Sequence, residues 1–245
     1  MKFYGRIFKG RPIPTEVFTD ESSHRKQKEM GGKLESHVDH LVIGANTLEE
    51  GQNYVYETLG VLPGPGGLHP KMGTHNLLLK LGNSIYLEVI APDRDAAPPE
   101  RPRWFGLDKF STLTKPGLLT WVVRTNHIDQ AVKKVIFDCG EIENMNRGNL
   151  DWLITITRDE TMPMEGIAPA LIQWKTGQHP ALSLAESGCS FLRMEGTHPN
   201  ANDITESLLS IGFEGAFRVK SHGEDQKPSL IAFIETPWGI KKLIS

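Results

Sequence analysis

The stretch that decides the fold is His37-Val38-Asp39-His40-Leu41-Val42-Ile43-Gly44, which is answered downstream by Ile85-Tyr86-Leu87-Glu88-Val89-Ile90-Ala91-Pro92. Both segments predict buried β-strands, because they are apolar runs rich in β-branched residues. Each carries a candidate metal ligand, His40 in the first and Glu88 in the second. A histidine or a carboxylate on an apolar strand is costly unless it is paired, hydrogen-bonded or bound to an ion. The two segments therefore indicate chemistry as well as packing.

The sequence around this stretch has a strand–helix–hairpin order. Thr47 and Glu50 form a capping box that predicts a helix start, and Gly60 predicts the helix end. Two strands joined by a tight turn follow, at 76–81 and 84–91.

The same order returns twice further along the chain. From residue 117 we expect a strand, a helix ended by Gly140 and two closing strands, at 118–124, 128–140, 151–158 and 170–175. A shorter third copy is predicted by a strand, a helix ended by Gly212 and two further strands, at 189–196, 203–211, 216–220 and 230–235. Such internal repetition is typical of a fold built from similar modules.

Composition narrows the class of protein. The chain has 245 residues, of which 38% are hydrophobic and 23% charged, with a net charge of −3. These values are typical of ordinary globular proteins and give no reason to expect binding to nucleic acid or to an acidic membrane surface. Cys139 and Cys189 form neither a disulfide framework nor a thiolate metal site, so we expect a reducing, cytoplasmic location.

Two segments differ from the modules. Residues 1–36 have a basic excess and no hydrophobic periodicity, so we expect a disordered tail or an over-long gene start, with Met30 as the true beginning and 37–245 as the domain. The connector 93–115 is long and rich in proline, and it either covers a site or only spaces two modules.

These residues resemble the vicinal oxygen chelate superfamily, and within it the glyoxalase-like domain group, over roughly residues 37–240. The motifs that carry the resemblance are Val38-Asp39-His40-Leu41-Val42, Gly60, Gly73-Thr74-His75-Asn76-Leu77 and Tyr86–Pro92, with weaker matches at Asn146-Arg147-Gly148, Ile172-Gln173-Trp174 and His179-Pro180. The resemblance implies an α+β fold of tandem βαβββ modules, here at about 37–92 and 117–176 with the shorter third repeat at about 189–241. In that superfamily the curved sheets enclose a cleft that often holds a divalent metal on the first and last strands of a module.

His40 and Glu88 occupy those two positions, and His75 is the candidate third ligand for zinc, iron, nickel or manganese. The donor atoms of His40 and Glu88 should then lie about 3–4 Å apart across the ion, with His75 within reach directly or through water. Other roles remain open: a hydrogen-bonded core histidine for His40, a salt bridge with Arg147 for Glu88, and a contact to substrate or to a ligand for His75.

The second module does not repeat these ligands. Aligned on the first, it brings Thr120 to the position of His40 and Gln173 to that of Glu88. Threonine is a poor ligand, so a full four-ligand glyoxalase site is not expected. We predict instead that Trp121, Gln173 and His179 contact substrate and that Arg147 binds a substrate carboxylate through both of its terminal nitrogens.

The leading functional hypothesis is a metal-dependent enzyme, of isomerase, lyase or dioxygenase type, acting on a substrate with neighbouring oxygens. Glu88 would move a proton and Arg147 would orient the substrate. The alternative is a metal-free protein of the same fold that binds or sequesters a small molecule. The expected partner is a small molecule, not nucleic acid or a membrane, and a homodimer is left open.

Overall fold

The strands predicted around His40 and Glu88 are present and lie side by side. The computed structural model describes residues 32–110, 114–158, 161–175, 177–223 and 226–245, and Lys33–Ser245 form one compact unit. Most of the predicted tail lies outside the described residues. Leu34 and Ser36, which the sequence placed at its end, are buried, and the Ser36 hydroxyl donates to the carbonyl of Ile211.

The first module is β1 (Ser36–Gly44), α1 (Leu48–Leu59), β2 (Gly64–His69), β3 (Thr74–Gly82) and β4 (Ile85–Pro92). The predicted caps of its helix are present. The Thr47 hydroxyl accepts from the Glu50 amide at 3.1 Å, and Gly60 takes a left-handed conformation with φ 77°. β1 pairs in parallel with β4, the last strand of the module.

The second module is β5 (Gly117–Thr125), α2 (Ile128–Val132), β6 (Glu141–Arg147), β7 (Leu150–Ile156) and β8 (Ala170–Trp174). Its helix is shorter than predicted and ends eight residues before Gly140, since 140 − 132 = 8. Beyond the end of α2, a tertiary hydrogen bond replaces the helical one, because the Ile136 amide donates to the Ser207 hydroxyl and not to a helical carbonyl. β5 pairs in parallel with β8, as β1 pairs with β4.

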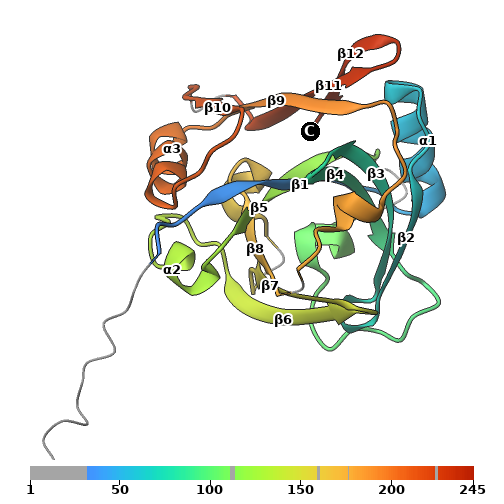
Figure 1. Ribbon diagram of the computed structural model, residues 1–245, viewed down its shortest axis with the longest axis horizontal. Coiled ribbons are helices and arrows are strands. Elements are labelled where there is room, and N and C mark those ends of the chain that lie inside the picture. Colours follow the sequence, from blue (N-terminus) through green and yellow to red (C-terminus); the bar gives the residue numbers. More distant parts are fainter. Residues whose placement is uncertain (1–31, 111–113, 159–160, 176, 224–225) are drawn as a thin grey trace, which may run out of the picture. The chain divides into compact units, whose positions relative to one another are not determined.

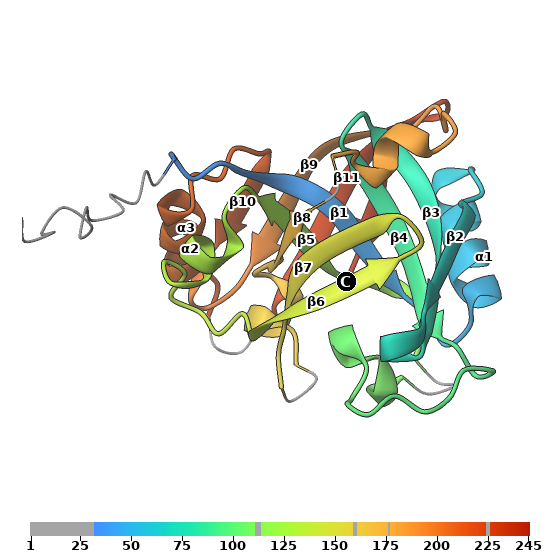
Figure 2. The ribbon, with the colours of Figure 1, turned by 60° about the horizontal axis from the view of Figure 1, so that its bottom comes forward.

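The two modules join through antiparallel pairing of β1 with β5. The result is one eight-stranded sheet in the order β2-β3-β4-β1-β5-β8-β7-β6. The sheet curls into a half barrel, so that the outer strands β2 and β6 approach each other (Figure 1, Figure 2). The predicted α+β class with a curled sheet is confirmed.

The third segment is β9 (Ser190–Thr197), α3 (Ala201–Ser210), β10 (Phe217–Lys220), β11 (Ser229–Thr236) and β12 (Gly239–Ile244). Its order of elements follows the predicted repeat, but its pairing does not. β9 lies between β10, to which it is parallel, and β11, to which it is antiparallel, in a separate sheet of order β10-β9-β11-β12. It is therefore not equivalent to the two modules in strand pairing.

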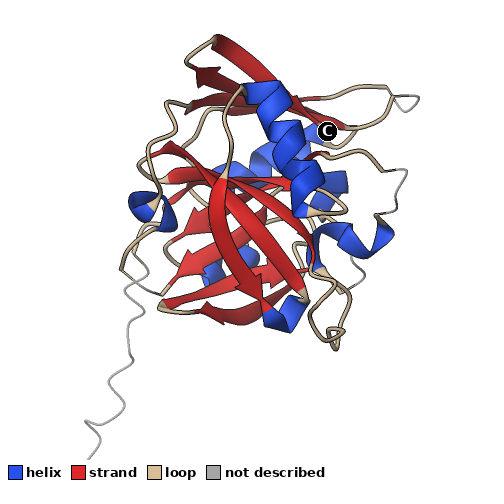
Figure 3. Cartoon of the chain, turned by 90° about the vertical axis from the view of Figure 1, so that its right-hand side faces the viewer, coloured by secondary structure: helices blue, strands red, loops and turns tan. Residues whose placement is uncertain are grey.

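Two hydrophobic clusters lie on opposite faces of the curled sheet. The outer cluster packs α1 and the four-stranded sheet (Figure 3), together with α2, against the half barrel. Trp121 meets Phe213 and Phe217 in this cluster. The inner cluster gathers apolar side chains of both modules and of the connector, including Trp104, Phe105 and Trp152. Within the described part of the chain, no helix has the length and apolar character needed to cross a membrane.

Candidate functional site

A small cavity of about 30 Å³ lies on the inner face of the curled sheet. Its polar wall comes from the first module and the end of β6, and consists of His40, His69, Asn76, Tyr86, Glu88 and Arg147. Its apolar wall comes from the second module and the connector, and consists of Trp104, Phe105, Trp152, Ile154, Ile172 and Trp174. The cavity thus sets ionisable groups opposite aromatic and aliphatic surface.

His40 and Glu88 face each other across this cavity. Parallel pairing sets His40 beside Tyr86 and Val42 beside Glu88, so the two side chains project from neighbouring strands on one face. The Nε2 atom of His40 lies 3.6 Å from the Oε2 atom of Glu88, and the two residues are only 4% and 6% exposed. The imidazole also stacks on Tyr86, with ring centroids 4.6 Å apart. The separation agrees with the expected 3–4 Å.

Asp39 holds His40 in place. A register shift between Val38 and His40 marks a bulge in β1, and the bulge brings Asp39 beside His40 instead of onto the opposite face. The His40 Nδ1 atom lies 2.6 Å from Asp39 Oδ1, and the Trp174 indole N–H donates to Asp39 Oδ2 at 2.8 Å. An imidazole that donates through Nδ1 presents Nε2, and here Nε2 is the atom that faces Glu88.

His179 completes the environment of Asp39. Its Nδ1 atom accepts from the Ala181 amide at 3.2 Å, so its Nε2 carries the hydrogen that it donates to Asp39 Oδ2 at 2.9 Å. Burial alone would raise the pKa of Asp39, but the hydrogen bonds from His179 and His40 outweigh it and hold that pKa well below its usual range. Asp39 is therefore a fixed negative charge that orients both imidazoles.

Asn76 links Glu88 to Arg147. Its Nδ2 donates to Glu88 Oε1 at 2.5 Å, and its Oδ1 accepts from Arg147 Nη1 at 3.1 Å and from the Gly67 amide at 2.7 Å. An arginine and a backbone amide can only donate, so the orientation of the Asn76 amide is unambiguous. Glu88 Oε2 is left facing the cavity and His40.

His69 supports Arg147 from the other side. Arg147 Nη1 donates to His69 Nε2 at 3.1 Å, and His69 Nδ1 lies 3.1 Å from the Thr74 hydroxyl. Burial, with a smaller contribution from the nearby Arg147 charge, lowers the pKa of His69 to about 4, although Glu88 acts in the opposite direction. His69 is thus a neutral acceptor at pH 7. Within the described residues, Arg147 makes no ion pair with a carboxylate.

The structure does not bring the other predicted residues into the cavity. His75 precedes Asn76 on β3, and strand alternation turns its side chain to the opposite face. Trp121 is fully buried in the outer cluster, where its indole donates to the Ile167 carbonyl at 2.9 Å. Gln173 lies between two cavity-facing residues and accepts from the Ile128 amide at 2.8 Å, at the start of α2. His179 does not line the cavity either, and its imidazole donates a hydrogen bond to Asp39.

Strand pairing also corrects the alignment of the modules. Leu41 and Trp121 pair with each other at the junction of the modules, which makes Thr120 the counterpart of His40 and Val122 the counterpart of Val42. Val42 pairs with Glu88 and Val122 pairs with Ala170, so the counterpart of Glu88 is Ala170 and not Gln173. The second module therefore supplies a hydroxyl and a methyl group where the first supplies an imidazole and a carboxylate.

The number of donor atoms in the cavity determines whether a divalent metal can be held there. His40 Nε2 and Glu88 Oε2 are spaced as two ligands of one ion, whereas catalytic metal sites commonly have three protein ligands. His69 Nε2 is engaged with Arg147, and the second module adds no donor at the equivalent positions. No group of three His, Cys, Asp or Glu side chains in the described ranges is arranged to hold a metal. The described residues thus do not complete a metal site on their own.

Sequence reasoning missed Asp39, His69 and Asn76 as parts of the site. The bulge that redirects Asp39 leaves no sequence signal. Asn76 has a sequence signal, because it lies next to His75 in the motif Gly73–Leu77. Side chains alternate between the two faces of a strand, and in the predicted hairpin of 76–81 and 84–91 this alternation places Asn76, not His75, on the face of Glu88. The length of the connector indicates either a cover over a site or a spacer, and its residues Trp104 and Phe105 form part of the cavity wall.

Comparison with known proteins agrees with this architecture. A family model described as glyoxalase-like domain matches residues 38–212. A search of curated proteins found no significant match. A hypothetical protein from Staphylococcus aureus is similar in structure with a TM-score of 0.51 and 14% identity, over 76% of this chain and 86% of that chain. Methylmalonyl-CoA epimerase from Streptomyces coelicolor gives a TM-score of 0.41 and 16% identity, over 58% and 97%. The model match spans most of the chain, which therefore belongs to the glyoxalase-like domain family.

Proposed function

We propose that the cavity between His40, Glu88 and Arg147 is the reaction site of a small-molecule enzyme. The proposed reaction moves a proton on a small anion with neighbouring oxygens, such as a 2-oxo carboxylate. The observation that carries the proposal is the state of Glu88: a buried carboxylate with one oxygen held by Asn76 and the other turned toward His40 in a cavity. Buried carboxylates with this freedom are typical general bases.

Arg147 is the anion-binding group of this proposal. Among the described residues that line the cavity it is the only arginine, and it donates to the neutral acceptors His69 and Asn76. A guanidinium without a carboxylate partner can bind a substrate carboxylate through two parallel N–H donors. That contact would fix the position of the substrate relative to Glu88.

Glu88 is the proton carrier. Its carboxylate would take the proton from the carbon next to the substrate carbonyl, and the electron pair of the broken C–H bond would move to the carbonyl oxygen to give an enolate. Return of the proton, to either face or to the neighbouring atom, would regenerate the carboxylate and complete an isomerisation with no other reactant. Asp39 fixes the orientation of His40, whose Nε2 atom faces Glu88.

A divalent-ion form of this function is the second candidate. One observation favours it: the 3.6 Å between His40 Nε2 and Glu88 Oε2 is long for a hydrogen bond and suits two ligand bonds of about 2.0–2.2 Å. Metal analysis of protein purified without added metal tests it. One equivalent of bound metal that His40→Ala removes would support this candidate, and metal-free protein that still exchanges protons would contradict it.

Solvent exchange tests the main proposal. In D₂O, the protein should catalyse deuterium incorporation next to the carbonyl of short 2-oxo carboxylates, followed by NMR. Glu88→Gln should abolish the exchange, because an amide is no base, and Glu57→Gln on the exposed face of α1 should leave it unchanged. Exchange that survives in Glu88→Gln would contradict the proposal. Binding of these compounds without exchange would favour the alternative, a protein that only binds or sequesters them.

A further inference from the structure

The cavity is too small for an organic substrate as it stands. Its volume of about 30 Å³ holds about two water molecules, whereas ligand pockets commonly measure about 300–1,000 Å³. Any substrate of the proposed reaction must therefore displace part of the wall and extend into a neighbouring space. The position of that space decides what kind of substrate can bind.

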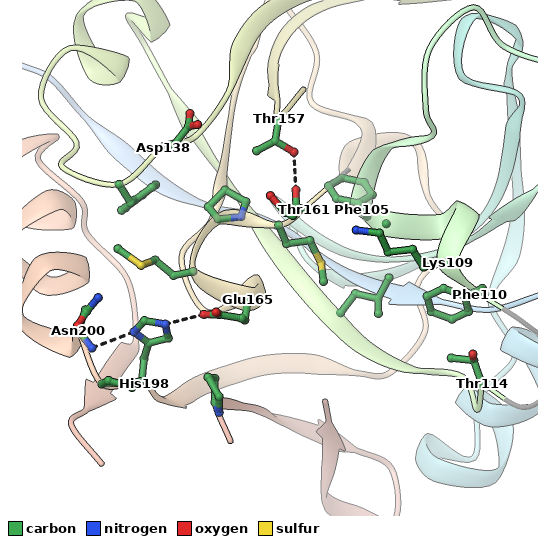
Figure 4. Close-up of a pocket in the computed structure, with 18 of the residues that line it drawn as sticks. Phe105, Lys109, Phe110, Thr114, Asp138, Thr157, Thr161, Glu165, His198 and Asn200 are labelled. Atoms are coloured by element: carbon green, nitrogen blue, oxygen red, sulfur yellow. Dashed lines mark hydrogen bonds and ion pairs between the residues drawn. The ribbon is translucent and has the colours of Figure 1, made fainter. Parts of the chain in front are cut away.

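A large groove lies beside Phe105, which lines it together with Phe110 and Thr114 (Figure 4). Its volume is about 930 Å³, and its lining is mainly apolar, with Phe105, Phe110, Leu119, Phe137, Met162 and Met164 among its residues. A narrow slot lies between the groove and the cavity. The slot shares Trp104, Phe105 and Ile154 with the cavity, and Phe105, Met162 and Pro163 with the groove. Phe105 therefore lines all three spaces.

The wall between these spaces carries two unfavourable features. The indole N–H of Trp104 is buried and has no hydrogen-bond partner among the described residues, which is rare and costly in a folded protein. Phe105 has φ 57°, in the left-handed region that residues with a Cβ atom seldom adopt. Both features would be relieved if the connector shifted, and a ligand oxygen could then accept from the Trp104 indole.

From these observations we infer that the groove is a second subsite for the same substrate, and that the substrate carries an unbranched or aromatic apolar chain. The chain passes Phe105 into the groove while its anionic end stays on Arg147. This inference rests on the proposed function and adds the class of substrate to it. A second neighbouring space, of about 270 Å³, has a mixed lining that includes Lys71, Asn144, Met72 and Met145, and a chain that entered it would not meet Met162.

Straight-chain carboxylates from butanoate to decanoate are the probes. Calorimetric titration should show the Kd falling with chain length, by up to about fourfold per methylene group, the factor that corresponds to about 0.8 kcal/mol per buried CH₂. The readout is the ratio of the butanoate Kd to the decanoate Kd. Met162→Glu, which places a charge at the junction of slot and groove, should bring this ratio close to one.

The controls distinguish a general effect on folding, a loss of the groove subsite and a failure of the proposed anion site. Leu209→Glu changes an apolar residue that is 71% exposed on α3 and should keep the wild-type ratio. Met162→Gln, a milder change, should lower the ratio partly if Met162→Glu proves unstable. A ratio close to one in the wild-type protein would overturn the inference. So would a ratio that stays at the wild-type value in both Met162 variants. No binding of butanoate at all would instead refute the proposed function, on which the inference depends.

Discussion

Asp39 is the residue on which the geometry of the site depends. It is fully buried, and its carboxylate accepts from His40, Trp174 and His179, which come from β1, β8 and the segment after β8. One charge therefore ties the two modules together and aims the His40 Nε2 atom at Glu88. A buried charge with three donors stabilises a structure only while every donor keeps its acceptor.

Asp39→Asn should lower the free energy of unfolding by about 3 kcal/mol, because the amide cannot accept from all three donors and brings a donor of its own. Urea denaturation measures the change. Asp129→Asn, at an exposed position in the first turn of α2, is the control and should cost under about 1 kcal/mol. Equal effects of the two substitutions would show that Asp39 does not organise the site.

His69 predicts a pH dependence of stability. Its pKa is lowered from 6.5 to about 4 in the folded protein, so between these values the unfolded chain binds more protons than the folded one. Stability due to His69 is then present above pH 6.5 and is lost as the pH falls toward 4, by up to about 3 kcal/mol. His69→Gln removes this dependence. The difference in unfolding free energy between wild type and His69→Gln should therefore shrink from pH 7 to pH 4, and a constant difference would contradict the assignment.

At the scale of elements, the sequence predicted the six inner strands of the eight-stranded sheet and missed its two edge strands, β2 and β6. β1 and β4 have long apolar runs, and β7 has buried apolar residues at alternate positions, so hydrophobic patterning predicts all three strands. β2 spans Gly64–His69 with three glycines and a proline, and β6 is mostly polar because it lies at the sheet edge. All but one of the residues in each of these two strands are exposed or half-buried, so hydrophobic patterning does not mark them. Arg147 was found by its motif, but its approach to His69 depends on the curl that brings β6 to β2.

α1 offers a direct test of local sequence signals. Thr47→Ala should cost about 1 kcal/mol of unfolding free energy, because it removes the acceptor of the Glu50 amide at the first turn. Thr47→Ser keeps a hydroxyl and should recover most of the loss. If Thr47→Ala and Thr47→Ser have equal stability in urea, the side-chain cap contributes nothing to α1.

At the scale of the whole molecule, two similar modules have divided their roles. The first supplies His40, His69 and Glu88, and the second supplies Arg147 and aromatic wall residues such as Trp152 and Trp174. Thr120 and Ala170 stand at the second-module positions equivalent to His40 and Glu88. Sequence comparison of the modules found Thr120 correctly but misplaced the counterpart of Glu88 by three residues. The misplacement arose because pairing register, and not motif position, defines equivalence between strands.

The boundary of the domain gives a prediction at the same scale. Deleting residues 1–31 should leave the melting temperature almost unchanged, since that segment has a basic excess and no hydrophobic periodicity. Deleting residues 1–36 should lower it by several degrees, because it also removes the buried Leu34 and Ser36. A large loss with the shorter deletion would place the domain boundary earlier than we propose.

The central claim is that Arg147 binds the anionic end of a substrate beside Glu88 in an aromatic cavity. Titration of the protein with benzoate, followed by the fluorescence of the wall tryptophans, tests it most directly. Wild type and Arg218→Met, a control at an exposed position of β10, should bind with the same Kd. Arg147→Met should weaken binding by about 10- to 100-fold, as expected for loss of charged hydrogen bonds worth about 1.5–3 kcal/mol. Equal affinity in wild type and Arg147→Met would contradict the account.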